Sequence, residues 1–485
     1  MKVSFVLLGA ALTLTSLAAE PLHAGDKPKE QKLDKKLDGY WVGPIKLGPV
    51  ELRVVAKFTK KKDGTLGGTL DSPDQGAKDI PIDEVTFKDP DLRFEVKSVK
   101  GVFEGKFKED GTELVGRWKQ GNLDVPLTLK RQDKPLVIVR PQEPKRPYPY
   151  LDEEVSYENK KAKVKFAGTL TLPKGKGPFP AVLLITGSGP QNRDEELLGH
   201  KPFLILADHL TRQGIAVLRV DDRGVGGSTG DTMQSTTADF AEDALAGVAY
   251  LKGRKEINPK QIGLLGHSEG GVVAPLAASQ SKDIAFIVLL AGTGLVGEEI
   301  LRMQTQLILK VNGADEKTRT VQKSLLDLML KLVKQEKDNA AALKAFDKLW
   351  PEIVAKLGDD QKKVDKVEAL AKKQFEGFLS PWFRHFIAHD PRLALRKVAC
   401  PVLALNGELD LQVPAKENLA AIGKALKEAG NKDVTLKEFP SLNHLFQTCK
   451  TGSPTEYASI EETMAPVVLR TISEWILKRT TTEKQ

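Results

Sequence analysis

Residues 261–279 read QIGLLGHSEGGVVAPLAAS. In this stretch an apolar run ends at Gly266, Ser268 follows two residues later, and small residues continue behind it. The pattern G-x-S-x-G between a strand and a helix predicts a nucleophile elbow, a strained turn that needs small neighbours and exposes its serine. The competing interpretation is that Ser268 only caps an ordinary helix. The rest of the chain decides between the two.

The sequence on either side of the elbow predicts an α/β fold. Continuously apolar runs alternate with helical patterns, and these runs lie at 181–187, 215–221, 261–267 and 284–292. Apolar strands that alternate with helices predict a mostly parallel sheet with helices on both faces. Alternating residues at 153–159 and 162–173 predict a hairpin that opens this sheet.

A helical insertion interrupts the alternation between about Leu295 and Leu393, where amphipathic helical stretches replace strands. The alternation resumes with the apolar runs at 401–407 and 434–440. A helical block between two strands of a parallel sheet is most simply a lid over the carboxyl ends of the strands, where ligands bind.

The chain before residue 151 divides into four segments. Residues 1–24 combine Lys2, a short apolar stretch and small residues, which is typical of a cleaved secretory signal peptide; an uncleaved anchor is the alternative. A Lys/Asp-rich linker fills 25–37, and short alternating strands with Asp-Gly turns at 38–135 predict an all-β antiparallel module. Four prolines between Arg140 and Tyr150 mark 136–150 as a stiff linker, so the α/β domain spans 151–485.

Composition narrows the classes of partner. The 73 Lys and Arg against 65 Asp and Glu give a net charge of +8, but both signs are interleaved and no basic stripe with stacking aromatics occurs. We therefore expect no nucleic-acid partner. No stretch after residue 24 is long and apolar enough to span a bilayer, so we expect no stable membrane span and an exported protein, periplasmic or extracellular. The oligomeric state stays open.

The sequence lacks the signatures of a bound metal or cofactor. No group of His, Cys and acidic residues has metal-ligand spacing, and the glycines of DDRGVGGSTG have neither a Walker lysine nor the dinucleotide spacing. We therefore expect neither metal nor cofactor, and interpret Asp222 and Arg223 as a polar bracket for the neighbouring loops. The two cysteines, Cys400 and Cys449, fall at opposite ends of the predicted sheet, so we expect free thiols.

Ser268 has candidate partners later in the chain. A serine nucleophile needs a histidine base and an acid that orients the base, and in this architecture the chain order is serine, acid, histidine. Asp410 follows the strand at 401–407, and His444 follows the strand at 434–440. Ser268, Asp410 and His444 are therefore the predicted catalytic triad.

Two rivals sit close to these residues. Glu408 is the other possible acid, but Asp410 lies further beyond the strand, where the loop can turn toward a histidine. His267 adjoins Ser268, but the elbow is expected to point its ring into the sheet, away from the hydroxyl.

The loops next to the elbow supply the predicted substrate contacts. The backbone N–H of Glu269 is one oxyanion donor, and the loop after the strand at 181–187 supplies the second, with Ser188 as first choice and Gly189 as the alternative. In the helical insertion, a cluster of aromatic side chains either lines an acyl pocket or packs within the lid. This cluster is Trp382, Phe383 and Phe386.

Five motifs in order make residues 151–477 resemble the α/β-hydrolase superfamily, in particular bacterial serine carboxylesterases of the dienelactone-hydrolase and prolyl-oligopeptidase-like branch with an inserted helical lid. The motifs are ITGSGPQNRDE, DDRGVGGS, GHSEGG, NGELDLQVP and LNHLFQ. The resemblance implies hydrolysis of small carboxylic esters, commonly with short acyl chains, with Ser268 as nucleophile, Asp410 as acid and His444 as base. Thr186 departs from it, because many relatives have His before the glycine there, which leaves the second oxyanion donor open.

Two other functions compete with ester cleavage. A serine peptidase or acylaminoacyl hydrolase would use the same triad, so the triad does not discriminate between them. A non-catalytic envelope protein that binds glycans through its β-module would predict a defective triad, whereas this one is complete in sequence.

Overall fold

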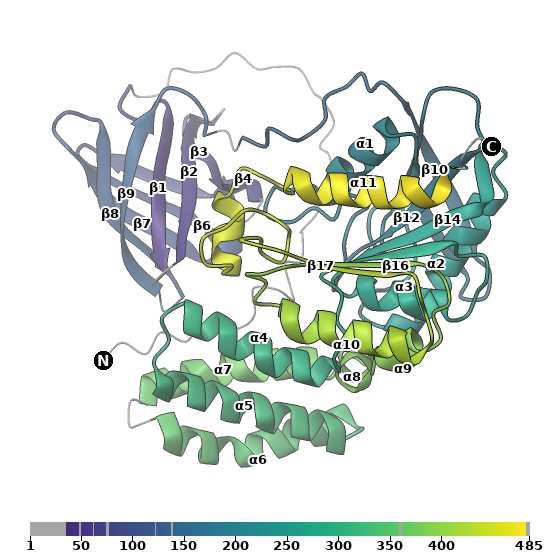
Figure 1. The fold of residues 1–485 in the computed structure, drawn as a ribbon. Coiled ribbons are helices and arrows are strands. Elements are labelled where there is room, and N and C mark those ends of the chain that lie inside the picture. Colours follow the sequence, from purple (N-terminus) through teal and green to yellow (C-terminus); the bar gives the residue numbers. More distant parts are fainter. Residues whose placement is uncertain are drawn as a thin grey trace. The chain divides into compact units, whose positions relative to one another are not determined.

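The computed structural model describes residues 35–481 except 48–49, 62, 74–76, 122, 137–138 and 358–360. The predicted signal peptide at 1–24 and most of the linker at 25–37 lie outside the described residues. The chain forms two compact units, which are taken in turn (Figure 1). Among the described helices, none has the length and apolar character needed to cross a bilayer.

The first unit is an antiparallel sheet of nine strands in the order β4-β3-β2-β1-β9-β8-β7-β6-β5. The strands are β1 (Tyr40–Leu47), β2 (Val50–Lys60), β3 (Leu66–Ser72), β4 (Ala77–Ile82), β5 (Glu84–Lys88), β6 (Asp91–Val96), β7 (Gly101–Phe107), β8 (Glu113–Gln120) and β9 (Leu123–Gln132). Only Asp83 separates the edge strands β4 and β5, so the sheet curls into a nearly closed barrel filled by large side chains such as Trp41, Phe94 and Trp118 (Figure 1). The predicted all-β fold is confirmed; β1, β4 and β5 add to the strands that alternation singles out.

The second unit contains an eight-stranded sheet in the order β10-β11-β13-β12-β14-β15-β16-β17. Its strands are β10 (Leu151–Asn159), β11 (Val164–Leu172), β12 (Phe179–Ile185), β13 (Ala216–Val220), β14 (Ile257–His267), β15 (Phe286–Leu290), β16 (Val402–Gly407) and β17 (Val434–Phe439). Strands β10, β11 and β13 pair antiparallel, and the pairs from β13 through β12 to β17 are parallel. The predicted mostly parallel sheet with an opening hairpin is confirmed.

Helices cover both faces of this sheet, each over its own apolar layer. One face carries α1 (Pro202–Arg212) and α11 (Pro466–Thr480); the other carries α2 (Thr237–Lys252), α3 (Gly270–Ala278) and α10 (Ala415–Glu428) (Figure 1). Strand β12 has β13 on one side and β14 on the other, so the strand order reverses there. The loops after β12 and β14 therefore meet at a topological switch point, where such sheets bind ligands.

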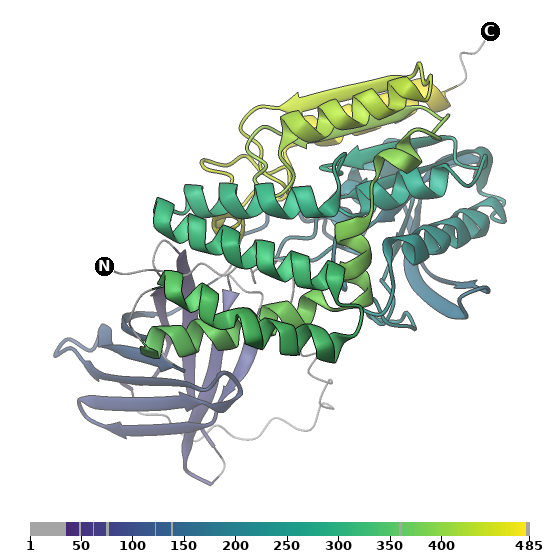
Figure 2. The same ribbon diagram turned by 90° about the horizontal axis from the view of Figure 1, so that it is seen from below.

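The insertion between β15 and β16 is helical throughout its described elements. It comprises α4 (Gly297–Val311), α5 (Glu316–Gln335), α6 (Asn339–Leu357), α7 (Gln361–Phe378), α8 (Pro381–Ala388) and α9 (Arg392–Leu395). Figure 2 shows the green helices of this block packed side by side. They share an apolar core of their own, which includes Phe346, Phe375 and Phe383, so the block folds around its own buried surface.

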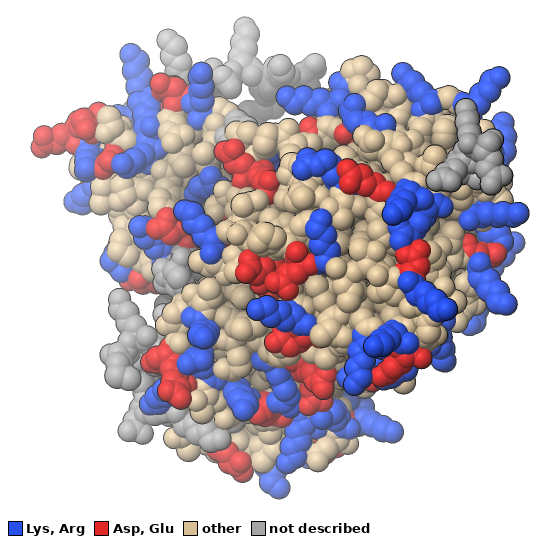
Figure 3. Space-filling model, in the orientation of Figure 1, with Lys and Arg blue, Asp and Glu red and all other residues tan. Residues whose placement is uncertain are grey.

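The surface mixes both signs of charge. On the face in view in Figure 3, Lys and Arg side chains alternate with Asp and Glu. Many form exposed ion pairs, such as Arg396 with Glu428 at 2.6 Å, which contribute about 0–1 kcal/mol each to stability.

The two cysteines are free, as predicted. Burial raises the pKa of each thiol to about 11, so Cys400 and Cys449 are protonated at neutral pH.

Candidate active site

Ser268 lies at the turn between β14 and α3. Its backbone is in the left-handed region, with φ 53°, and its N–H donates to the carbonyl oxygen of Leu290 at 2.8 Å. The residue that caps α3 is Glu269, and no side chain makes a capping hydrogen bond there. The structure therefore has the strained turn of an elbow and does not use Ser268 as a helix cap.

The glycines around Ser268 are required by close backbone approaches. A Cβ on Gly266 would stand 1.9 Å from the carbonyl oxygen of Gly270, and a Cβ on Gly270 would stand 2.2 Å from that of Ile185. Contacts this short exist for no real methyl group, so the turn seats β14 against the end of β12 only with glycine at both positions.

Gly270→Ala is expected to lower the free energy of unfolding by about 1–3 kcal/mol, because the methyl group meets fixed backbone on β12. Thermal denaturation measures the change. Gly377→Ala is the matched control: it sits in α7 with nothing within 4 Å of the added Cβ, and the helix should gain slightly. Equal melting temperatures for both variants would contradict the crowding at Gly270.

Asp410 and His444 meet in the structure. The Nδ1 of His444 lies 2.8 Å from Oδ2 of Asp410, while Oδ1 of Asp410 accepts the N–H groups of Gln412 and Val413, both at 2.8 Å. Asp410 is 2% exposed and His444 4%. The carboxylate is thus fixed by three donors, and it holds the imidazole of His444 by Nδ1.

The rival acid lies elsewhere. Glu408 is exposed, and its Oε2 accepts the N–H of Ser441 at 3.0 Å, so it braces the connection that follows β17. The Oγ of Ser268 makes no hydrogen bond with any residue in the described part of the chain, so the structure joins His444 to Asp410 but does not join it to Ser268.

His267 makes two contacts that the sequence did not predict. Its ring is buried, with Nδ1 2.9 Å from Oε1 of Glu195 and Nε2 3.1 Å from the carbonyl oxygen of His444. The two rings of His267 and His444 lie 4.8 Å apart between centroids. Sequence reasoning missed Glu195; the only signal was its place at the end of the GSGPQNRDE loop.

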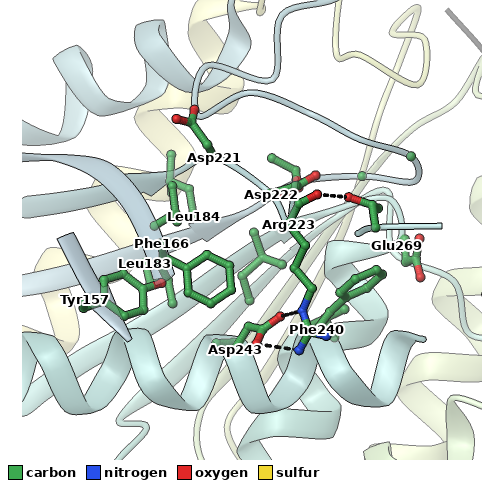
Figure 4. A pocket seen from close by; sticks show the side chains of 18 residues that line it. Tyr157, Phe166, Leu183, Leu184, Asp221, Asp222, Arg223, Phe240, Asp243 and Glu269 are labelled. Carbon is green, nitrogen blue, oxygen red and sulfur yellow. Dashed lines mark hydrogen bonds and ion pairs between the residues drawn. The ribbon is translucent and has the colours of Figure 1, made fainter. Parts of the chain in front are cut away.

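The loop after β12 is held by acidic side chains. Oδ1 of Asp222 accepts the hydroxyl of Thr186 at 2.7 Å, and Oδ2 accepts the N–H of Gln191 at 2.9 Å. Burial raises the pKa of Asp222 well above its ordinary value. Arg223 instead pairs with Asp243 on α2, at 2.6 and 2.8 Å (Figure 4). Asp222 and Arg223 therefore do not act on the same element: Asp222 holds the loop after β12, and Arg223 binds α2.

The candidate oxyanion donors are available. Within the described residues, the N–H groups of Ser188, Gly189 and Glu269 donate no backbone hydrogen bond. Gly187 differs, because its N–H donates to Oε1 of Glu195 at 2.7 Å. Ser188 therefore stays the first choice for the second donor and Gly189 the alternative.

The carboxylate of Glu269 forms a buried network. Trp382 on α8 donates its Nε1–H to both oxygens at 3.0 Å, and Thr237 donates its hydroxyl to Oε1 at 2.8 Å. Burial raises the pKa of Glu269, which is 4% exposed. The residue after the proposed nucleophile thus joins the helical insertion to the core by its side chain.

Glu269→Gln tests the cost of this buried charge. Because the folded pKa is raised, the folded protein binds the proton more tightly than the unfolded chain, and wild-type stability falls as pH rises from about 4 through the raised pKa. The variant has no carboxyl at this position and does not lose this stability. The melting temperature of the variant minus that of the wild type should therefore increase as pH rises over this range. A difference that stays constant with pH would contradict the raised pKa.

A cavity of about 70 Å³ borders the loop after β12 and the elbow. Figure 4 shows Tyr157 and Phe166 on one side of it and Glu269 on the other. Gly187 and Gly189 also line it, whereas Ser268, Asp410 and His444 do not. The cavity therefore lies beside the predicted triad and next to the candidate oxyanion donors.

The aromatic cluster of the insertion packs on itself. Phe383 stacks on Phe378 at 3.9 Å between ring centroids, and Trp382 stacks on Phe386 at 5.6 Å. Trp382 and Phe383 are buried, and the residues that line the 70 Å³ cavity include none of Trp382, Phe383 and Phe386. In this structure the three side chains pack within the insertion, with the indole N–H of Trp382 turned to Glu269.

Comparison with known proteins places these features in a family. The sequence profile of the family described as "Serine aminopeptidase, S33" matches residues 202–448, which is just over half of the 485 residues. Esterase EstD of Thermotoga maritima is 28% identical over 369 residues, 75% of this chain and 78% of EstD. Human acyl-coenzyme A thioesterase 1 is 31% identical over 128 residues, 26% of this chain and 27% of that protein.

Among solved structures, an esterase of Pyrococcus furiosus superposes with a TM-score of 0.42 and 18% identity over 68% of this chain and 91% of that one. The family match begins with α1 and spans the elbow and the loops that carry Asp410 and His444. The mixed sheet, the elbow and the match together mean that the chain belongs to the family described as serine aminopeptidase, S33, within the α/β-hydrolase superfamily.

Proposed function

We propose that the protein is a serine hydrolase that cleaves carboxylic esters with short acyl chains, with Ser268 as nucleophile, His444 as base and Asp410 as the acid that orients it. One observation carries the proposal: the buried carboxylate of Asp410, fixed by two backbone N–H groups, lies 2.8 Å from Nδ1 of His444. The other ring nitrogen is then the one free to take the serine proton.

The proposed reaction proceeds in two halves. The Nε2 of His444 takes the hydroxyl proton as Oγ of Ser268 bonds to the ester carbonyl carbon, and the N–H groups of Glu269 and Ser188, or Gly189, stabilise the oxyanion. The bond to the alcohol breaks, and His444 gives the proton to the leaving oxygen. Water then attacks the acyl-enzyme in the same way and releases the acid.

The acyl specificity is proposed from the sequence motifs and the relatives. EstD is named an esterase and the human relative a thioesterase, which favours an acyl bond to oxygen or sulfur as the substrate. The short-acyl preference is proposed from the likeness of the five sequence motifs to those of bacterial carboxylesterases. The signal-like segment at 1–24 supports the further proposal that the enzyme acts after export.

A labelling experiment tests the nucleophile. A fluorophosphonate should modify one serine, located by mass spectrometry on the tryptic peptide 261–282. Ser279→Ala is the matched control, because Ser279 lies on the same peptide and its hydroxyl donates to the carbonyl oxygen of Leu276 at 2.8 Å. Labelling that survives Ser268→Ala would reject the assignment.

A substrate panel tests the bond and the acyl length. Aryl acetates and butyrates should be cleaved with higher kcat/KM than aryl octanoates, acyl thioesters or peptide amides. Preferential cleavage of amides would favour the aminopeptidase chemistry in the family description, and preferential cleavage of octanoates would reject the short-acyl proposal.

A further inference from the structure

A buried pair of residues joins two parts of the site that the proposed mechanism uses. Glu195 is 5% exposed and His267 7%. Oε1 of Glu195 lies 2.9 Å from Nδ1 of His267 and accepts the N–H of Gly187 at 2.7 Å. On the far side of the ring, Nε2 lies 3.1 Å from the carbonyl oxygen of His444. One chain of contacts therefore runs from the loop after β12 to the backbone of the proposed base.

The donors and acceptors around the His267 ring determine how many protons the ring carries. The carbonyl oxygen of His444 has no proton to give, so Nε2 of His267 must donate. Nδ1 then either donates to an ionised Glu195 or receives a proton from a neutral one. The N–H of Gly187 donates to the same Oε1 at 2.7 Å, and a hydrogen bond from a backbone N–H favours the ionised carboxylate. Both ring nitrogens then carry protons.

The surroundings strengthen this pairing. Phe203, Leu290 and Phe446 line a void of about 10 Å³ beside Glu195 and His267, so water reaches the pair poorly. Burial pulls the pKa of His267 down, but the charge of Glu195 and its hydrogen bond outweigh burial, so the pKa is raised.

Three other ionisable groups act on the pair: His444 and Asp410 of the proposed triad act on His267, and Asp222 acts on Glu195 as a like charge. The backbone carbonyl of His444 accepts from the Nε2–H of His267, the two rings lie 4.8 Å apart between centroids, and the negative charge of Asp410 also favours the charged ring. The carbonyl needs the Nε2 proton and Asp410 is attracted to the positive ring, whereas the His444 ring repels that charge while it holds the proton taken from Ser268.

The backbone at Glu195 is strained for this role. Its φ is 50°, in the left-handed region, where a residue other than glycine costs about 1–2 kcal/mol. Such strain persists where surrounding structure fixes the conformation, often at functional sites. A glycine at this position would relieve the strain but would lack the carboxylate.

We propose that Glu195 and His267 form a buried carboxylate–imidazolium pair that positions both the oxyanion loop, through the N–H of Gly187, and the base, through the carbonyl of His444. They are positioning residues: neither touches the substrate. The catalytic consequence rests on the proposed function, whereas the charge state of the pair does not.

Glu195→Gln tests the pair. The amide oxygen replaces Oε1 as acceptor for Gly187, but the charge that keeps His267 doubly protonated is gone. A neutral ring has one N–H for two acceptors, so it loses its contact either with the new amide or with the carbonyl of His444. We expect kcat/KM for an aryl acetate to fall roughly tenfold to 10²-fold, the scale of a small misplacement of catalytic groups. The variant should also show an alkaline limb in its pH–rate profile near neutral pH, absent from the wild type.

A direct measurement reads the protonation state without any substrate. In the full chain with ¹⁵N-labelled histidine, the His267 signals are those that disappear in His267→Asn, and they should shift in Glu195→Gln but not in Glu196→Gln. Glu196 is the matched control, an exposed carboxylate one residue along. Wild-type His267 should keep both ring protons to a higher pH than an ordinary histidine, which loses one near neutral pH.

The outcomes separate this inference from the proposed function. A wild-type ring with one unprotonated nitrogen at neutral pH would overturn the inference, whatever the activity. An unchanged rate and pH profile in folded Glu195→Gln would overturn the positioning role. A protein that cleaves no ester but has a doubly protonated His267 would sink the proposed function and leave the pair standing. If the variant does not fold, the wild-type spectra decide alone.

Discussion

Replacing Ser268 with alanine is expected to lower kcat for an aryl acetate by about 10⁶-fold, the loss seen when the nucleophile of a serine hydrolase is removed. The substitution deletes only Oγ, which makes no hydrogen bond with the described residues, so the fold should be unaffected. Alanine also tolerates φ 53° about as well as serine does, and the elbow keeps its strain. A stopped assay over many hours measures the remaining activity, and active-site titration excludes contaminating enzymes.

Two observations control this experiment. The melting temperature of Ser268→Ala should stay within a few degrees of the wild type, because no buried contact is lost. Ser279→Ala should keep wild-type kcat. A loss of less than about tenfold in Ser268→Ala would mean that another group attacks the carbonyl.

Replacing Asp410 with asparagine is expected to lower kcat by about 10⁴-fold with little change in KM. The hydrogen bonds dictate why. The N–H groups of Gln412 and Val413 need an acceptor at Oδ1, so the asparagine amide must turn its NH₂ toward Nδ1 of His444. His444 is then forced into the tautomer that carries its proton on Nε2 and cannot take the proton of Ser268.

Glu408→Gln is the control for Asp410→Asn. It removes the same charge two residues away, from an exposed side chain that accepts the N–H of Ser441. Its kcat should match the wild type. If the two variants lose activity equally, the effect comes from charge near the strand end, and Asp410 does not orient the base.

Much of the fold and of the candidate site could be predicted from local sequence patterns and from the order of the motifs along the chain. The apolar strands, the elbow and the acid and histidine beyond later strands each follow from residues within a short window plus the rules of parallel sheets. Strands β1, β4 and β5 were not predicted. β1 contains Gly43 and Pro44 and β4 carries polar residues on a short edge, so neither alternates cleanly, and β5 alternates over only five residues.

The contacts that the sequence did not reveal all join distant residues. Glu195 and His267 are 72 residues apart, and Trp382 and Glu269 are 113 apart. The local sequence around one partner does not predict the other, because each contact depends on the positions of the loop after β12 and of helix α8 in the folded structure. The side chain of Glu269, adjacent to the predicted nucleophile, therefore has a role that its neighbourhood in sequence did not suggest.

The helical insertion leaves the sheet after β15 and returns to β16, its neighbour in the strand order. Because β15 and β16 are parallel, the block leaves the sheet at the carboxyl end of one strand and returns at the amino end of its neighbour. Any insertion long enough to cross back keeps the same strand pairing. Evolution can therefore exchange this block for one of another size without rewiring the sheet or the residues proposed for catalysis. What a replacement must reproduce is a partner for Glu269, because an exchanged helix without the indole of Trp382 would leave a buried carboxylate short of a donor.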